Sequence, residues 1–76
     1  MISYELPEET RVTINIYDIM GQAVRNIKRS ETQIAGYHQV YWNATNDEGK
    51  LVSAGVYLYV IQAGEFMHTK KMVLMH

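Results

Sequence analysis

Apolar and polar residues alternate with a period of two along several short segments, and this alternation most constrains how the chain can fold. The clearest case is the segment from Val12 to Tyr17, where three aliphatic β-branched residues alternate with Thr13, Asn15 and Tyr17. Successive side chains of a strand point to opposite faces, whereas a helix repeats every 3.6 residues. The segment is therefore predicted to be a half-buried β-strand.

Two other segments near the N-terminus are expected to be short strands. The first covers residues 2–6, directly before the only proline, Pro7. The second covers residues 22–28, where Val24 and Ile27 are the inward residues. Ile27 is out of phase with Val24, which indicates a β-bulge or a strand end. Residues 29–36 are polar and are predicted to form a connection.

The second half of the chain repeats the strand signals. Residues 37–43 alternate, with His38, Val40 and Trp42 on one face. Residues 56–63 are almost continuously apolar and are predicted to form a central strand covered on both faces. Residues 66–75 are expected to return as the last strand, after a two-residue hairpin turn at Gly64-Glu65.

Turn signals separate these strands at intervals of about 8–12 residues. Residues 45–50 form a strong turn signal, and four glycines are expected to serve as structural turns: Gly21, Gly36, Gly49 and Gly55. Such spacing favours a sandwich or small barrel. The prediction is an all-β fold, a small Ig-like β-sandwich of six or seven antiparallel strands.

A chain of 76 residues makes one domain, 1–76, with a small core. The residues expected in that core are Val12, Ile14, Ile16, Val40, Trp42, Tyr57 and Tyr59. Tyr37 and Tyr41 share the other face of their strand. The sequence leaves them open between core residues and an exposed row of rings for a sugar or a protein partner.

Composition excludes several classes of function. Seven Lys and Arg face eight Asp and Glu, so no basic surface for nucleic acid is expected. No apolar run approaches the roughly 20 residues of a transmembrane helix. No signal peptide opens the chain, so an export signal of that kind would lie upstream, and we expect that this domain was excised from a larger exported protein.

No constellation of catalytic, cofactor-binding or metal-binding residues stands out, and the chain is expected not to be an enzyme. The three histidines, His38, His68 and His76, lie in different segments without the spacing of a metal site. No serine lies in a G-x-S-x-G motif. Residues 46–49 (NDEG) resemble an oxygen-rich calcium loop, but they lack its alternating ligand positions, so a turn is the better interpretation.

Three stretches together carry a family resemblance: ISYELPEETRVTINIYDIMGQAVRNI, AGYHQVYWNATNDEG and SAGVYLYVIQAGEFMHTKKMVLMH. In this order they resemble the type A C-terminal sorting domain of the type IX secretion system of Bacteroidetes and related bacteria. The middle of the chain is also similar, more distantly, to the Ig-like domain of flagellar hook-capping proteins. That second similarity supports the fold but not a sorting role.

The first resemblance implies a function in protein export. Such domains direct a covalently linked cargo from the periplasm across the outer membrane through the type IX translocon. A sortase-like peptidase often removes the domain, and the cargo is attached to the cell surface or released. Besides Gly21, Val24, Gly36 and Gly55, the translocon recognition residues that the resemblance implies are Gly64, Lys70, Lys71, Met72, Val73 and Leu74.

Other interpretations of the chain stay open at this point. The last strand has a purely structural explanation, an edge strand that Lys70 and Lys71 protect from pairing with other chains. Exposed edges also allow a homodimer. The alternative function is a non-catalytic Ig-like module that binds a carbohydrate or a protein through Tyr37 and Tyr41, or a spacer of an extracellular enzyme.

Overall fold

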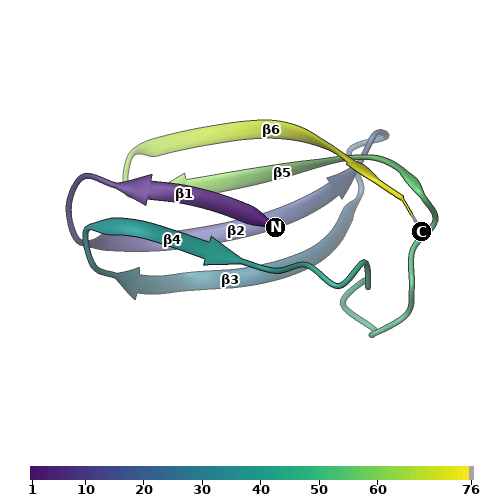
Figure 1. The fold of residues 1–76 in the computed structure, drawn as a ribbon, viewed down its shortest axis with the longest axis horizontal. Helices are drawn as coiled ribbons and strands as arrows, with labels where there is room; N and C mark the ends of the chain where they lie inside the picture. Colours follow the sequence, from purple (N-terminus) through teal and green to yellow (C-terminus); the bar gives the residue numbers. More distant parts are fainter. Residues whose placement is uncertain (76) are drawn as a thin grey trace.

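A computed structural model describes residues 1–75 and confirms the predicted all-β fold (Figure 1). Within this range the chain forms strands joined by turns and loops, with no helix. The six strands are β1 (Ile2–Leu6), β2 (Thr10–Asp18), β3 (Ala23–Gln33), β4 (Gly36–Val40), β5 (Gly55–Ala63) and β6 (Phe66–Leu74).

The strands form two antiparallel sheets of unequal size. The larger sheet has the order β3-β2-β5-β6, and the smaller one contains only β1 and β4. Figure 1 shows the small sheet lying in front of the large one. Two antiparallel sheets packed face to face make a sandwich, as expected, but here two strands face four. Part of the inner face of the large sheet is therefore left without a covering strand.

The core lies between the two sheets and is built mainly from β2. Val12, Ile14 and Ile16 have no exposed surface. They alternate with half-buried Thr13 and Asn15, as the period of two predicted. The other buried residues come from β1 and β5 and are Ile2, Leu6, Tyr57 and Ile61. The half-buried residues Val40, Trp42 and Tyr59 pack against this cluster.

The prediction of a polar connection over residues 29–36 is wrong at residues 29–33, which belong to β3. Two of the three irregularities in the β2–β3 pairing explain how this polar segment continues the strand. Lys28 pairs with Ile14 and Asn26 with Asn15, which leaves Ile27 as the extra residue of the bulge that the sequence indicated. The second lies at Ser30, whose φ is 48° and whose N–H donates to the Thr13 hydroxyl at 3.0 Å.

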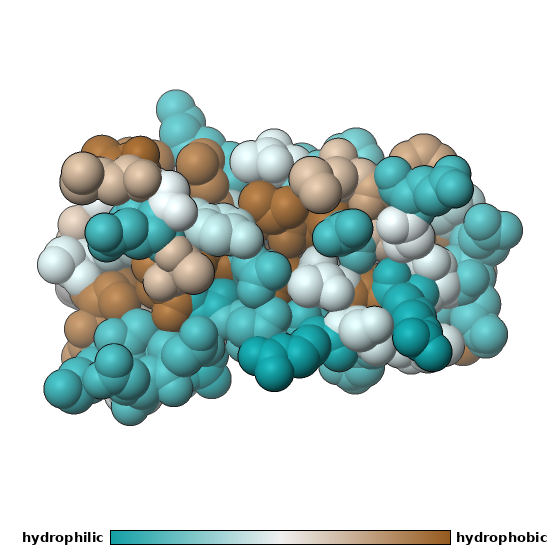
Figure 2. Space-filling view, turned by 180° about the vertical axis from the view of Figure 1, so that it is seen from behind, coloured by the Kyte–Doolittle hydropathy of each residue, from teal (hydrophilic) through white to brown (hydrophobic). Residues whose placement is uncertain are grey.

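β5 is central, between β2 and β6, but the prediction that it is covered on both faces is wrong. Its outward residues are Val56, which is exposed, and Leu58 and Val60, which are half-buried. No described element packs on this outer face, and neighbouring side chains in the same sheet shield it in part. Figure 2 shows apolar side chains gathered over β5 and β6, with polar ones along the β3 edge.

Candidate functional site

β6 is the edge strand of the large sheet and the most exposed strand of the molecule. It pairs with β5 along one edge only. All six residues from Phe66 to Lys71 are exposed, as is Val73. Met72 and Leu74 are half-buried and pack against the core. The first two thirds of β6 therefore offer both side chains and unpaired backbone groups to a partner, while its end anchors the strand.

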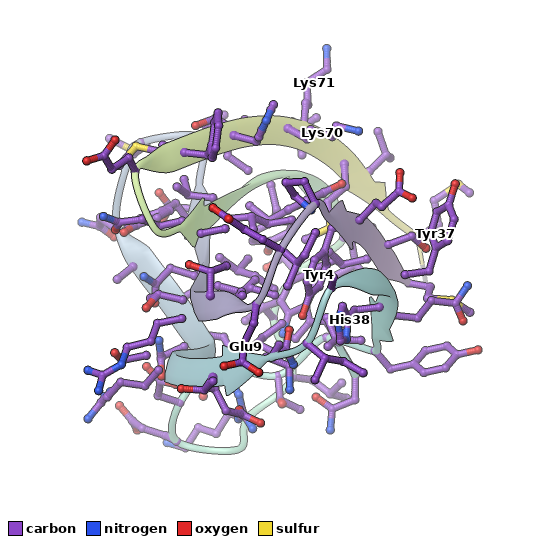
Figure 3. The ribbon with its side chains drawn as sticks, turned by 90° about the vertical axis from the view of Figure 1, so that its left-hand side faces the viewer. Tyr4, Glu9, Tyr37, His38, Lys70 and Lys71 are labelled. Carbon is purple, nitrogen blue, oxygen red and sulfur yellow. The ribbon has the colours of Figure 1, made fainter. Side chains whose placement is uncertain are left out.

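Lys70 and Lys71 lie on opposite faces of this strand. Lys70 pairs with Tyr59, whose side chain packs toward the core, and Lys71 pairs with Leu58 on the outer face. Figure 3 shows Lys71 pointing away from the molecule. Neither ammonium group takes part in an ion pair with a described residue. Both charges are therefore available to an acidic partner, each on its own side of the sheet.

Gly64 sets the direction in which β6 leaves β5. Ala63 pairs with Phe66, so Gly64 and Glu65 form the predicted two-residue hairpin turn. The φ of Gly64 is +61°, a left-handed conformation that glycine adopts without strain. A Cβ atom here would also lie 2.9 Å from the Thr10 hydroxyl oxygen. Gly64 is one of the residues implied in translocon recognition, but the backbone conformation and the Thr10 contact alone explain why it is glycine.

A groove lies between β1 and the inner face of β6. Its volume is about 410 Å³, and its walls come from residues 3–7 together with Ile61, Ala63, Phe66, His68 and Lys70. A second depression, of about 220 Å³, continues it past Pro7 toward Gly64 and Glu65. The groove exists because no strand of the small sheet lies beside β1 to cover β6.

Tyr37 and Tyr41 lie on the outer side of the small sheet, where their exposed fractions are 80% and 76%. The alternation of residues 37–42 is confirmed, because His38, Val40 and Trp42 are half-buried on the opposite side. Trp42 donates its indole N–H to the Thr45 carbonyl at 2.7 Å and meets Tyr57 edge-to-face. The two tyrosines that the sequence left open are therefore surface rings.

His38 stacks on Tyr4 across the small sheet, with ring centroids 5.4 Å apart (Figure 3). Its Nε2 atom lies 2.8 Å from the Ile34 carbonyl oxygen. The Tyr4 hydroxyl donates to the Gln33 side chain. Burial is the main reason why the pKa of Tyr4 is raised; the bond to Gln33 lowers it, and the charge of Glu31 raises it.

The loop over residues 46–50 is a structured turn. The Asn46 side-chain oxygen accepts hydrogen bonds from the N–H groups of Glu48 and Lys50, both at 3.0 Å. Asp47 accepts one from the Asn26 N–H at 3.0 Å, so its carboxylate joins the loop to β3. Backbone amides thus bind one side-chain oxygen each of Asn46 and Asp47, as in a turn. Within residues 1–75 no group of three His, Cys, Asp or Glu side chains is arranged to hold a metal.

The groove is the feature that sequence reasoning missed. Phe66, His68 and Lys70 alternate along the last strand, so they were bound to share a face. The sequence does not show which strands form the smaller sheet, and so does not show that this face stays uncovered. His76, the last residue, lies outside the described residues. None of the described residues forms a helix long and apolar enough to cross a bilayer.

Two antiparallel sheets around an apolar core, with one sheet reduced to two strands, define an Ig-like β-sandwich domain. The chain belongs to the FlgD Ig-like domain family, whose family model matches residues 2–65. That match ends before β6, whereas the structural comparison extends over 95% of the chain. The last strand is therefore shared as structure and lies outside the family match.

The structural comparison is with the crystal structure of FlgD from P. aeruginosa. The two chains superpose with a TM-score of 0.74 at 25% sequence identity. The chain spans 57% of the length of that FlgD chain. No curated protein matches the sequence. The similarity to the hook-capping Ig-like domain, expected as the more distant one, is thus the one that the comparisons support; they give no support to the type IX sorting family.

Proposed function

We propose that this Ig-like domain is non-catalytic and works as a secretion signal for a covalently linked cargo protein. In this proposal the type IX translocon recognises β6 and carries the cargo from the periplasm across the outer membrane. A sortase-like peptidase then separates the domain from its cargo, which stays on the cell surface or is released. The mechanism is recognition of a folded strand, without any bond-making step in the domain itself.

The free edge of β6 is the observation that carries this proposal. Edge strands of native proteins are usually short, covered or twisted, because unpaired backbone groups invite pairing with other chains. β6 has nine residues, and six consecutive ones from Phe66 to Lys71 are exposed. A partner that adds a strand here gains backbone hydrogen bonds, and the side chains on either face supply specificity.

The sequence resemblance to sorting domains supplies the identity of the partner, and the FlgD-type fold supplies the scaffold. Lys70 and Lys71 give the strand a local positive charge on both of its faces. Opposite charge on a partner accelerates the encounter and fixes the register of the added strand. An acidic strand-binding surface of the translocon is therefore the chemistry that this proposal requires.

The two lysines provide the test. The chain is fused to the C-terminus of a fluorescent protein with a Sec signal and produced in a bacterium that has the type IX system. We expect the double variant Lys70→Ala/Lys71→Ala to lower surface or secreted fluorescence about fivefold or more, because both steering charges are lost. Lys50→Ala removes an exposed lysine of the 46–50 loop and is the matched control. Undiminished export of the double variant would contradict recognition through these charges.

Exposure of Tyr37 and Tyr41 favours a second candidate, a carbohydrate-binding module. Exposed rings on a rigid sheet offer flat apolar surfaces against which a sugar can pack. This candidate predicts saturable binding of a soluble polysaccharide, lost in the variant Tyr37→Ala/Tyr41→Ala. Leu51→Ala, which removes another exposed apolar side chain, is the control. Absence of binding across a polysaccharide panel would remove this candidate.

A further inference from the structure

The free edge of β1 borders the groove, and this edge is as unpaired as that of β6. β1 pairs only with β4, through residues 2–6. Its other edge carries backbone N–H and C=O groups that no neighbouring strand satisfies. Residues 3–7 of the chain form one wall of the groove below this edge. A backbone placed in the groove thus has hydrogen-bonding groups within reach along one side.

The floor of the groove is apolar at one end and ends at Lys70 at the other, and Glu5 belongs to the β1 wall. Leu6 and Ile61 are buried beneath it, and the ring of Phe66 is 63% exposed along its side. His68 and Lys70 follow Phe66 at alternate positions on the same face of β6. The volume of about 410 Å³ is within the range of ligand-binding clefts, roughly 300–1,000 Å³.

We propose that this groove is an acceptor site for an extended peptide of a partner protein, which adds as a third strand to the small sheet beside β1. Neighbouring strands lie about 4.8 Å apart and stacked sheets about 10 Å apart, so such a strand covers the inner face of β6. Every second side chain of the peptide then faces the floor. The matching peptide has apolar residues opposite Ala63 and Phe66, and a carboxylate opposite Lys70.

Charge argues for a separate acidic peptide over the large sheet of a second copy, while pairing with a second copy's β1, which carries Glu5, is an outcome of the test. The edge strands that a second copy offers from its large sheet are β3 and β6. β3 contains two arginines and one lysine against one glutamate, and β6 contains two lysines and no acidic residue. Like charges placed close together oppose association, and Lys70 already gives the groove a positive end.

This site shares Lys70 with the export proposal but uses the free edge of β1, whereas export needs the free edge of β6. Lys71, on the outer face of β6, separates the two experimentally. Substitution of Lys71 changes the edge strand but leaves the groove intact. If the chain fails to bind the peptide while export persists, the groove proposal is wrong. If the peptide binds but the fused cargo is not exported, the export proposal is wrong.

The test is an NMR titration of the full 76-residue chain, labelled with ¹⁵N. The ligand is a ten-residue peptide of alternating threonine and valine, in which one central valine is replaced by glutamate. We expect saturable shifts at the amides of residues 3–6 and 66–70, and slower hydrogen exchange along β1. Lys70→Glu is expected to weaken binding about fivefold or more, and a peptide with lysine in place of the glutamate is expected to restore it.

Lys71→Glu is the matched control and is expected to leave the affinity for the peptide within about twofold, because its side chain is on the other face. Far-ultraviolet circular dichroism checks that each variant is folded. The proposal is overturned if no saturable shift appears, or if the shifts map to β3 instead of β1. It is equally overturned if the Lys71→Glu variant loses as much affinity as Lys70→Glu, or if the same shifts arise on concentrating the chain without peptide.

Discussion

Gly64 combines two constraints, of which the other glycines carry only the first. Its φ of +61° is unfavourable for other residues, and the Thr10 hydroxyl occupies the space of a Cβ atom. Gly21 has a φ of +84°, but a Cβ atom added there would meet no other atom within 4 Å. The two glycines therefore separate the effect of backbone strain from the effect of crowding.

We expect Gly64→Ala to lower the free energy of unfolding by about 2–3 kcal/mol and Gly21→Ala by about 1–2 kcal/mol. The difference arises because only the first variant forces Thr10 to move. Urea denaturation of both variants measures it. If the two variants lose the same stability, the contact between Gly64 and Thr10 does not matter for folding.

The fold alters the ionisation of Tyr4. Burial raises its pKa above the ordinary value of 10.0. Below that value the phenol is neutral in both states and stability does not depend on it. As the pH rises past 10.0, the unfolded chain ionises first, and stability falls until the pH passes the pKa of the folded state.

We therefore expect the free energy of unfolding to fall less steeply above pH 10 in Tyr4→Phe than in the unaltered chain. Tyr41→Phe removes a hydroxyl from an exposed ring and serves as the matched variant. Denaturation series at pH 9–11 provide the comparison. Equal slopes for Tyr4→Phe and the unaltered chain would show that Tyr4 ionises alike in both states.

At the scale of elements, two turns of the chain share one design. In each, an Asx side chain accepts two backbone N–H groups and a glycine follows three residues later. Asp18 accepts from Met20 and Gln22 at 2.9 Å. Asn46 accepts in the same way from the residues two and four positions further on. The second turn is also joined to β3, where the Arg25 guanidinium donates to the Asn46 carbonyl at 2.7 Å.

Loss of either Asx side chain is expected to destabilise the fold, since two backbone donors lose their acceptor. We expect Asp18→Ala and Asn46→Ala each to lower the free energy of unfolding by about 1–2 kcal/mol. Glu48→Ala, an exposed neighbour in the second turn, is expected to change it by less than about 0.5 kcal/mol. Thermal or urea unfolding measures all three. A result for Asp18→Ala as small as that for Glu48→Ala would contradict the role given to these turns.

The strands and their inward faces could be predicted from the sequence because alternation depends only on local geometry. The bulge at Ile27 was indicated for the same reason, as a break in that alternation. The extension of β3 over residues 29–33 was not predicted, because polar residues on an edge strand have no apolar pattern. The uncovered outer face of β5 was not predicted, because an apolar run does not show which elements cover the strand.

The candidate site was predictable only in part. The positions of Lys70 and Lys71 on opposite faces of the last strand follow from its period of two. Exposure of Tyr37 and Tyr41 had to come from the structure, since an alternating strand does not show which face meets the other sheet. The groove beside β1 depends on how strands from the two ends of the chain are assigned to the sheets, and no local pattern contains that information.

At the scale of the whole molecule, the unequal sheets shape what the domain can do. Two strands facing four leave a free edge on β1 and an exposed inner face on β6, side by side around one groove. The free edge of β6 adds a second place where a strand can bind. The fold thus keeps a small buried core while offering much backbone to partners.

Export of a fused cargo tests the central claim most directly. The chain is placed on the C-terminus of a fluorescent protein that carries a Sec signal, and its location is compared in a type IX-competent strain and in the same strain with the translocon disabled. We predict fluorescence on the cell surface or in the medium of the competent strain alone. Intact, folded fusion that stays in the periplasm of both strains would contradict the export function.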